Sequence, residues 1–421
     1  MDNRLLISIR SFIISAGAAA AASFVGVYGV FLGASPAEMG FLQSTSTSVS
    51  NGGQILWGRI SDRVGRRLPF LIMGSISLAA LWFMMPYVAN PVNLIIVYSL
   101  ISLFGAMITV NWFAFIADSV DQQRRGRFLS LINNLSSVGT IISILAMSLF
   151  FGGSAIHDLA IPFMAASASY LISTVLLFRG REVKNKAQKI TGMKETIREM
   201  RSDRTFSRYF FATTVQAYFW SMAWPMFPMT IVAVMRFNVT QIAYLTVASL
   251  SITVIGQYLM GRIVDRFNRV PLIFINRMML CVIPLMYGFF QNLPEFLVME
   301  IYSGFVGAIQ TVVMTSYLLD ISPARSRAQY ISTINGLNGV VYLFGALSGG
   351  FLLQFLVGSY ALRTALMIAY IIVFAGRLAS SFLFLRLEEA GGNSRRDFPL
   401  FNILLRWKQP GNPSGTTVGP R

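Results

Sequence analysis

The sequence predicts an all-α membrane protein of about twelve transmembrane helices, built as two related six-helix halves. Three observations predict this fold class: an apolar composition, basic residues that return between apolar runs, and an internal repeat. Of the 421 residues, 55% are hydrophobic and only 12% are charged, which excludes an ordinary water-soluble surface. Because one spanning helix takes roughly 20 mostly apolar residues, a dozen spans would fill roughly 240 positions.

Apolar runs bounded by charges and turn residues define the predicted spans. In the first half they are 9–33, 37–58, 69–88, 93–117, 128–151 and 159–178. In the second half they are 206–234, 240–261, 271–291, 295–319, 330–357 and 361–386. The predicted domains are an N-terminal bundle (1–178), a cytoplasmic central loop (179–205), a C-terminal bundle (206–388) and a cytoplasmic tail (389–421).

The net charge of +17 is spread in short bursts between alternate spans and does not form one patch. This spacing argues against a nucleic-acid partner and indicates membrane topology. By the positive-inside rule, both termini and the central loop face the cytoplasm, and we expect a multi-pass protein of the cell membrane. The central segment 191–204 is either a short surface helix or a solvated linker, and the tail from 391 onward is either solvated or anchored at the lipid interface.

Cysteine and histidine usage argues against several kinds of chemistry. The chain has one cysteine, Cys281, and one histidine, His157, so an intramolecular disulfide, a cysteine-based metal cluster and a zinc cage are not expected. No His, Cys or carboxylate cluster falls within the predicted spans. We therefore predict neither an enzyme nor a cofactor or metal site.

An internal repeat relates the two halves. The segment GRISDRVGRR (58–67) returns as GRIVDRFNR (261–269), an offset of 203 positions. The turns after the first and seventh spans, SPAE (35–38) and NVTQ (238–241), align at the same offset. Since six crossings return the chain to its starting side, two such halves repeat in the same orientation.

The segment 58–67, between the second and third predicted spans, resembles the signature loop of the major facilitator superfamily in pattern and in position. Its second copy lies between the eighth and ninth spans, and the resemblance covers roughly residues 10–388. It implies that family's fold, in which two six-helix bundles enclose a central site near mid-membrane. Within the first copy, Gly58 permits close helix contact and Gly65 permits a sharp turn.

The resemblance also implies a conformational gate on the cytoplasmic side. Asp62 is expected to approach the start of span eleven, and Arg66 to pair with Asp118. In the mirror copy an aspartate approaches the start of span five, and Arg269 pairs with Asp320. These contacts would close the cytoplasmic side and break as the halves rock, unless the charges serve only as topology signals. The predicted gate residues are Gly58, Asp62, Arg63, Gly65, Arg66, Asp118, Gly261, Asp265, Arg266, Arg269 and Asp320.

Spans one, four, seven and ten line the cavity in this family, so the resemblance directs attention to their polar and aromatic residues. Span seven is the richest, and Pro225 and Pro228 can bend it. Packing between helices is the alternative role for each residue, and it is the role assigned to Asn133 and Asn335, which recur in both halves. The predicted solute-binding residues are Asn111, Trp112, Gln216, Trp220, Trp224, Tyr302 and Gln310.

Buried carboxylates are the usual proton carriers in membranes, and none falls in the central part of spans one, four or seven. Glu300 in span ten is the predicted proton-coupling residue, with Glu38 or a cytoplasmic-end aspartate as alternatives. Arg277 in span nine and Arg377 in span twelve also interrupt apolar runs. We assign them no solute role, because both spans lie outside the cavity in this fold and a long arginine can reach the interface.

The predicted function is secondary transport of a small organic solute by alternating access, carried out by a monomer, with a proton as the candidate coupling ion. An aromatic, largely uncharged cavity slightly favours export of neutral or amphipathic compounds; uptake of sugars or other metabolites is the alternative. Span four lacks the buried arginine, and span five the Gly-Pro-rich pattern, that many proton-driven drug exporters carry. A receptor that binds solute without carrying it is the alternative from another class.

Overall fold

The structure is a computed structural model, which describes residues 3–119, 125–151, 155–180, 198, 200, 202–264, 266–322 and 327–389. Within these ranges the chain is helical, with short turns between helices. The segment 181–197 and the tail 390–421 lie outside the described residues, so the expectations of a surface helix and an interfacial anchor stay predictions.

The helices of the first half pack into one bundle. The first predicted span is broken into α1, a π-helical turn η1, α2 and α3, and the next five follow as single helices. Their bounds are α1 Asn3–Ile14, η1 Ser15–Ala19, α2 Ala20–Ala22, α3 Val25–Phe31, α4 Pro36–Val64, α5 Leu68–Met84, α6 Pro91–Ser119, α7 Arg125–Ser148 and α8 Ala155–Leu177.

The helices of the second half form the other bundle and repeat this plan. The seventh span is interrupted, as the first span is. Their bounds are α10 Arg204–Met222, α11 Met226–Met229, η3 Thr230–Val234, α12 Val239–Val264, α13 Arg269–Phe289, α14 Leu293–Ile321, α15 Arg327–Val357, α16 Leu362–Ser381 and η4 Phe382–Arg386.

The broken spans show why their sequences cannot form one straight helix. In the seventh span the helix stops at Met222, and turns at 223–225 precede α11. Pro225 has no N–H to donate and its ring crowds the preceding turn, so the break falls there, as expected from the prolines. In the first span the break follows Ser23, near the position equivalent to Met226 in the repeat.

Both aligned turns after the broken spans are capping boxes. The backbone N–H of Ser35 donates to Glu38 Oε2 at 2.8 Å, and the Glu38 N–H donates to Ser35 Oγ at 3.3 Å. Asn238 and Gln241 make the same reciprocal bonds at 3.0 and 2.8 Å. Each pair supplies partners for backbone N–H groups that the first helical turn leaves free, so the duplicated turns begin α4 and α12 in the same way.

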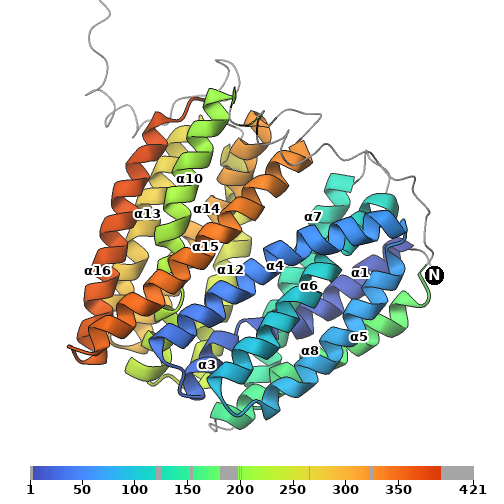
Figure 1. Ribbon diagram of the computed structural model, residues 1–421, viewed down its shortest axis with the longest axis horizontal. Coiled ribbons are helices and arrows are strands. Elements are labelled where there is room, and N and C mark those ends of the chain that lie inside the picture. Colours follow the sequence, from blue (N-terminus) through green and yellow to red (C-terminus); the bar gives the residue numbers. More distant parts are fainter. Residues whose placement is uncertain are drawn as a thin grey trace, which may run out of the picture.

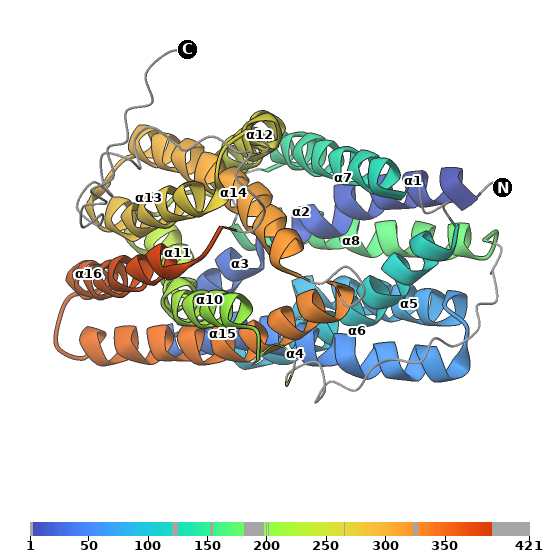
Figure 2. The ribbon, with the colours of Figure 1, turned by 90° about the horizontal axis from the view of Figure 1, so that it is seen from above.

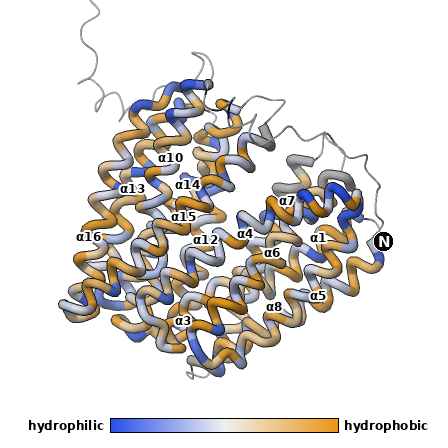
Figure 3. Tube along the Cα trace, in the orientation of Figure 1, coloured by the Kyte–Doolittle hydropathy of each residue, from blue (hydrophilic) through white to orange (hydrophobic). Residues whose placement is uncertain are grey.

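Eleven helical segments of the described chain are long and apolar enough to cross a membrane. The second predicted span, α4, is too polar to count by composition, because its middle is rich in Ser and Thr. The hydroxyls of Ser44, Ser46 and Thr47 donate to carbonyls three or four residues earlier at 3.0–3.2 Å. These bonds satisfy the polar groups inside the helix, which packs between α6 and α15. Figure 3 shows hydrophobic residues along the helices and hydrophilic ones gathered toward the helix ends.

The two bundles form a V (Figure 1). They meet around α3 and α11 and through the pairs α4–α15 and α7–α12, which Figure 2 shows from above. They diverge toward the side on which α4 ends and α10 begins. We name this side, with the 58–67 segment and the start of α10, the basic end, and we name the opposite side the narrow end.

Glycines allow close contact between the bundles at the narrow end. A Cβ added at Gly350 of α15 would lie 2.7 Å from the Pro36 carbonyl oxygen and 2.9 Å from the Cα of Gly40. A Cβ added at Gly26 of α3 would lie 3.0 Å from Pro228. Small residues let helix backbones approach in this way, so the V is closed at the narrow end by backbone-level packing.

Candidate functional site

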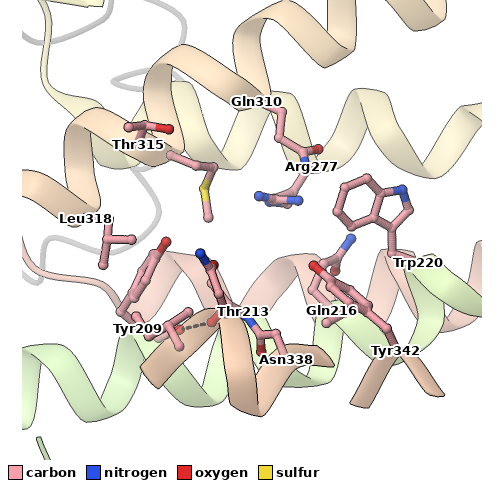
Figure 4. A pocket seen from close by; sticks show the side chains of 14 residues that line it. Tyr209, Thr213, Gln216, Trp220, Arg277, Gln310, Thr315, Leu318, Asn338 and Tyr342 are labelled. Atoms are coloured by element: carbon pink, nitrogen blue, oxygen red, sulfur yellow. Dashed lines mark hydrogen bonds between the residues drawn. The ribbon is translucent and has the colours of Figure 1, made fainter. Parts of the chain in front are cut away.

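A cavity of about 180 Å³ lies within the second bundle, between α10, α13, α14 and α15. Figure 4 shows side chains from these four helices converging on it. The lining combines amides, hydroxyls, three aromatic rings and one arginine. Its residues are Tyr209, Thr213, Gln216, Ala217, Trp220, Arg277, Gln310, Met314, Thr315, Leu318, Ile334, Asn335, Asn338 and Tyr342.

Two glutamines in the cavity have unsatisfied amide atoms. Gln216 on α10 is only 2% exposed; its Oε1 accepts a hydrogen bond from Ser380, and its Nε2 has no hydrogen-bond partner among the described residues. Oε1 of Gln310 on α14 is likewise buried and without a described partner. A buried polar atom without a partner costs free energy, so both side chains are suited to bond a molecule in the cavity.

Aromatic rings form the end of the cavity near the break in the seventh span. Trp220 packs against Tyr342 of α15, with their ring centroids 6.0 Å apart in a T-shaped arrangement. Trp224 stands behind them, 5.1 Å from Tyr342, and is not among the lining residues. The predicted residues Gln216, Trp220 and Gln310 therefore meet at one cavity, and Trp224 supports its aromatic wall.

Three other predicted solute-binding residues lie elsewhere. The Asn111 amide donates to the Met107 carbonyl of its own helix at 2.8 Å, and Trp112 lies under the Arg10 guanidinium, 4.0 Å from the ring centroid. Tyr302 donates to the Met279 carbonyl at 2.8 Å and so joins α14 to α13. These residues serve packing in this conformation, which was the alternative role.

Arg277 corrects the sequence interpretation. Its helix, α13, was expected to lie outside the cavity, yet the guanidinium is one of the lining groups (Figure 4) and is 4% exposed. Asn335, assigned to packing from its recurrence, also lines the cavity. The interrupted apolar run around Arg277 was the sequence signal, and the length of an arginine side chain explains how a residue on an outer helix reaches the site.

Arg377 of α16 is structural. Its guanidinium donates to the carbonyls of Trp220, Phe219 and Leu280 at 2.9, 3.3 and 3.1 Å. The first two carbonyls lie in the last turn of α10, where the helix ends and its carbonyls lose their intrahelical partners. Arg377 thus holds the broken end of α10 in place beside the cavity.

Arg10 is another buried arginine that the charge pattern alone did not identify. From its place near the N-terminus it resembles one of the basic residues that mark membrane topology, but it lies inside α1 and is 2% exposed. Its Nε donates to Ser173 of α8 at 2.7 Å, and its guanidinium covers the Trp112 ring. The helix begins earlier than the predicted residue 9, which places Arg10 within the first bundle.

The first bundle contains a cavity of its own, of about 520 Å³. Hydroxyl and amide groups of α4 line it, which accounts for the polarity of that helix. Residues of the first span, α5 and α6 and Tyr170 of α8 complete it. Its polar lining residues include Ser46, Thr47, Ser50, Asn51, Ser102 and Thr109.

The predicted gate loop is largely helical. Gly58 to Val64 form the last turns of α4, and the chain turns at Gly65, which has a φ of +67° and donates its N–H to the Ser61 carbonyl at 2.9 Å. A Cβ added at Gly58 would meet only Val110, at 3.5 Å, an ordinary contact. Gly65 therefore needs a glycine-compatible backbone, whereas Gly58 has room for a side chain in this conformation.

The charged gate residues fall into three groups: those with a described partner, those with exposed side chains, and those whose side chains lie outside the described part. Asp62 pairs with Arg67 of its own loop, and Arg269 pairs with Asp320 at 2.6 Å. Both members of the second pair belong to the second bundle, so the pair forms while the basic ends of the bundles stand apart. The side chains of Arg63, Arg66 and Arg266 and the backbone of Gly261 are exposed, and the Asp118 side chain, Asp265 and residues 323–326 before α15 lie outside the described part.

Glu300 lies on α14, closer to the narrow end than the cavity is. Tyr287 of α13 donates its hydroxyl hydrogen to Glu300 Oε1 at 3.0 Å. Ten residues separate Glu300 from Gln310, which is about 15 Å along a helix. Glu300 is therefore held between two helices and does not line the cavity. Glu38, the alternative proton carrier, is committed to the cap of α4.

Comparisons with known proteins agree with this architecture. The sequence model of the Major Facilitator Superfamily matches residues 7–213 and 209–413, one match per half. No curated protein matches the sequence.

Several solved transporters share the fold. The nucleoside transporter NupG is similar with a TM-score of 0.72 at 13% identity, covering 92% of this chain and 99% of that one. A D-xylose-proton symporter gives 0.70 at 15% identity, with 93% and 99% covered. A bacterial homolog of the human lysosomal transporter Spinster, in an inward-facing and occupied conformation, gives 0.69 at 13% identity, with 91% and 95% covered. At these identities the likeness shows the fold. With the family model matched over both halves, the chain belongs to the Major Facilitator Superfamily and is a multi-pass membrane transporter.

Proposed function

We propose that this protein is a secondary transporter that moves a small organic solute by alternating access, and that the cavity of the second bundle is its solute site. The observation that carries the proposal is the set of buried, unpartnered polar atoms at the cavity, on Gln216, Gln310 and Arg277. Such atoms gain free energy when a bound molecule supplies the missing partners. The aromatic wall of Trp220 and Tyr342 suits a ring or another apolar body.

The orientation belongs to the proposal too. Basic residues gather at the wide side of the V, and the positive-inside rule places that side in the cytoplasm of a cell membrane. The V is then an inward-open conformation with the narrow end closed toward the outside. The family's usual condition, a monomer, is the proposed working unit.

We assign the gate to the basic end. In the closed state, Asp62 leaves Arg67 and approaches the start of α15, where backbone N–H groups and the helix dipole favour a carboxylate. The pair Arg269–Asp320 lies within one bundle and moves with it as a rigid part. Asp62→Asn is therefore expected to favour the open basic end and to slow transport.

For the direction of transport we propose no single answer, and for the coupling ion we propose a proton. A preference for exporting neutral compounds rested on a cavity without charge, and Arg277 removes that basis. Export of amphipathic compounds and uptake of metabolites both fit an aromatic and polar cavity. Glu300 is the proposed proton carrier; since it stands away from the cavity, its protonation would act through the α13–α14 contact with Tyr287.

The test begins with ligand discovery on the detergent-purified full chain, by thermal stabilisation against sugars, amino acids, carboxylates and lipophilic cations. A solute at about 100 times its dissociation constant adds about 2.7 kcal/mol to the stability of the bound protein. Counterflow of the stabilising solute into proteoliposomes then measures transport.

The variants that test the site, and their control, each replace one glutamine with leucine. Gln216→Leu and Gln310→Leu remove hydrogen bonds to the solute and are expected to weaken its binding about three- to tenfold. Gln354→Leu is the control, because Gln354 of α15 is exposed and away from the cavity. Binding without any flux into proteoliposomes would contradict transport and indicate a solute receptor.

A further inference from the structure

Arg277 is a buried cation without a hydrogen-bond or ion-pair partner among the described residues. Its guanidinium carbon lies 5.1 Å from the centroid of the Phe384 ring. Its side chain makes no hydrogen bond or ion pair with any residue that the structure describes, and its Nε is buried without a partner. In Figure 4 the guanidinium stands between Gln310 and the side chains of α10.

Arg377, in the neighbouring helix, shows how a buried arginine is normally accommodated here. Its guanidinium nitrogens donate hydrogen bonds to three backbone carbonyls, so these donors are satisfied inside the protein. Arg277 has no comparable set of acceptors in the described residues. An isolated charge in the membrane interior is costly, and a protein keeps one where it pairs or functions.

The cavity offers no carboxylate to balance this charge. None of the described residues that line it is Asp or Glu. The other lining groups are neutral amides, hydroxyls, aromatic rings and apolar side chains. Because no described residue balances this charge, a bound solute is the partner that the structure leaves room for, and the cavity is the open space next to the guanidinium.

The neighbouring groups define the kind of anion. A guanidinium binds a planar oxyanion through two parallel N–H donors, and the unpartnered Nε2 of Gln216 supplies a further donor at the same cavity. Tyr209, Trp220 and Tyr342 provide apolar faces for the rest of the molecule. The cavity volume of about 180 Å³ is enough to hold a small organic molecule.

We infer that the solute is a small organic anion with one carboxylate-like group and an apolar or aromatic body, and that Arg277 binds the anionic group. The inference rests on the proposed function and narrows it to a substrate class. The guanidinium is buried, and a charge attraction beside a buried group is stronger than one between two fully exposed groups.

The test compares anions with their neutral amides on the detergent-purified full chain. The probes are benzoate and phenylacetate, each beside benzamide and phenylacetamide, at up to millimolar concentrations, with affinity measured by calorimetry and thermal stabilisation. The carboxylates are expected to bind and the amides to bind at least about tenfold more weakly, the difference that a hydrogen bond to a charged group makes.

Three variants at two cavity positions assign the effect to the cavity. Arg277→Gln removes the charge and is expected to weaken carboxylate binding about ten- to a hundredfold, whereas Arg277→Lys keeps the charge and part of the affinity. Gln310→Glu keeps Arg277 but adds a carboxylate to the same cavity, so it is expected to weaken anion binding similarly. Arg363→Gln removes an exposed arginine of α16 and is the control, with binding unchanged.

The outcomes separate the inference from the proposed function. Amides that bind as well as carboxylates, no binding of either anion, or anion binding that survives both Arg277→Gln and Gln310→Glu in folded protein would overturn the inference. Flux of a neutral solute that Arg277→Gln leaves unchanged would keep the transporter and reject the anion. Anion binding through Arg277 without flux would keep the anion site and reject transport.

Discussion

Three buried arginines show how the surroundings of one residue type decide its role. Arg377 donates to three carbonyls and fixes the end of α10, and Arg10 joins α1 to α8 and covers Trp112. Arg277 faces the cavity without a described hydrogen-bond partner. Arg377 is satisfied by three carbonyls, and Arg10 is held by Ser173 and the Trp112 ring although its Nη2 has no partner among the described residues. Neither lines the cavity of the second bundle, so we assign both to packing, whereas Arg277 lines that cavity and is available to a solute.

Arg377→Gln is expected to lower the free energy of unfolding. The shorter side chain leaves buried carbonyls of Phe219, Trp220 and Leu280 without donors, which costs about 1–3 kcal/mol. Thermal unfolding in detergent measures the change, with Arg363→Gln as the exposed control. Equal stability of the two variants would show that the three hydrogen bonds contribute little.

Glu300→Gln tests proton coupling. If Glu300 carries the proton, a glutamine cannot release or take it up, and a pH gradient no longer drives accumulation in proteoliposomes. Exchange of solute at equal pH on both sides should continue, since that step needs no net proton movement. Tyr287→Phe, which removes only the hydroxyl bonded to Glu300, should give a smaller loss. Gradient-driven accumulation that persists in Glu300→Gln would exclude this residue.

At the scale of elements, the turn chemistry and the break in the seventh span could be predicted from the sequence, whereas the break in the first span, which has no proline, could not. The aligned turns at Ser35 and Asn238 form the same capping box, and the prolines of the seventh span fall where α10 ends. Such features depend on neighbouring residues alone. The direction in which each helix presents its side chains depends on its neighbours, and here the sequence was weaker: Asn111, Trp112 and Tyr302 lie away from the cavity.

Gly350→Ala tests the glycine contact between α4 and α15. The added methyl would lie 2.7 Å from the Pro36 oxygen, so the narrow end can close only with a backbone shift that costs about 1–3 kcal/mol. We expect slower transport and faster labelling, from the narrow side, of a cysteine at Gln43, which lies 3.1 Å from the Cβ position of Gly26.

Gly52→Ala is the matched control for this contact, because a Cβ at Gly52 of α4 meets no atom within 4 Å. Its transport and labelling should equal those of the parent protein. If Gly350→Ala also behaves like the parent, the close approach of the two glycines does not limit closure.

At the scale of the whole molecule, duplication explains the fold. The repeated 58–67 and 261–269 segments and the matching turns predict two similar bundles, and the family match to each half is in accord with them. The conformation could not be predicted in this way. Both states of an alternating-access protein use the same helices, and they differ in which end of the bundles is packed.

The residues that line the cavity could be predicted only in part, because the sequence indicates which helices lie near the cavity but not how far each side chain reaches. Gln216, Trp220 and Gln310 were found from their residue types on spans that usually line the site. Arg277 was excluded because its helix is an outer one, although its side chain reaches the cavity between α10, α13, α14 and α15 (Figure 4). A list of spans places helix axes and cannot give the reach of a long side chain.

The most direct test of alternating access is the accessibility of the cavity from each side of the membrane. In a Cys281→Ser background, a cysteine replaces Thr315, an exposed lining residue, and is labelled with an impermeant reagent in right-side-out and inside-out vesicles. A cysteine at Ser359, in the narrow-end turn, is the one-sided control. The account predicts that Thr315→Cys reacts from both sides, faster from the basic end. Labelling from the basic end alone, with and without solute, would contradict it.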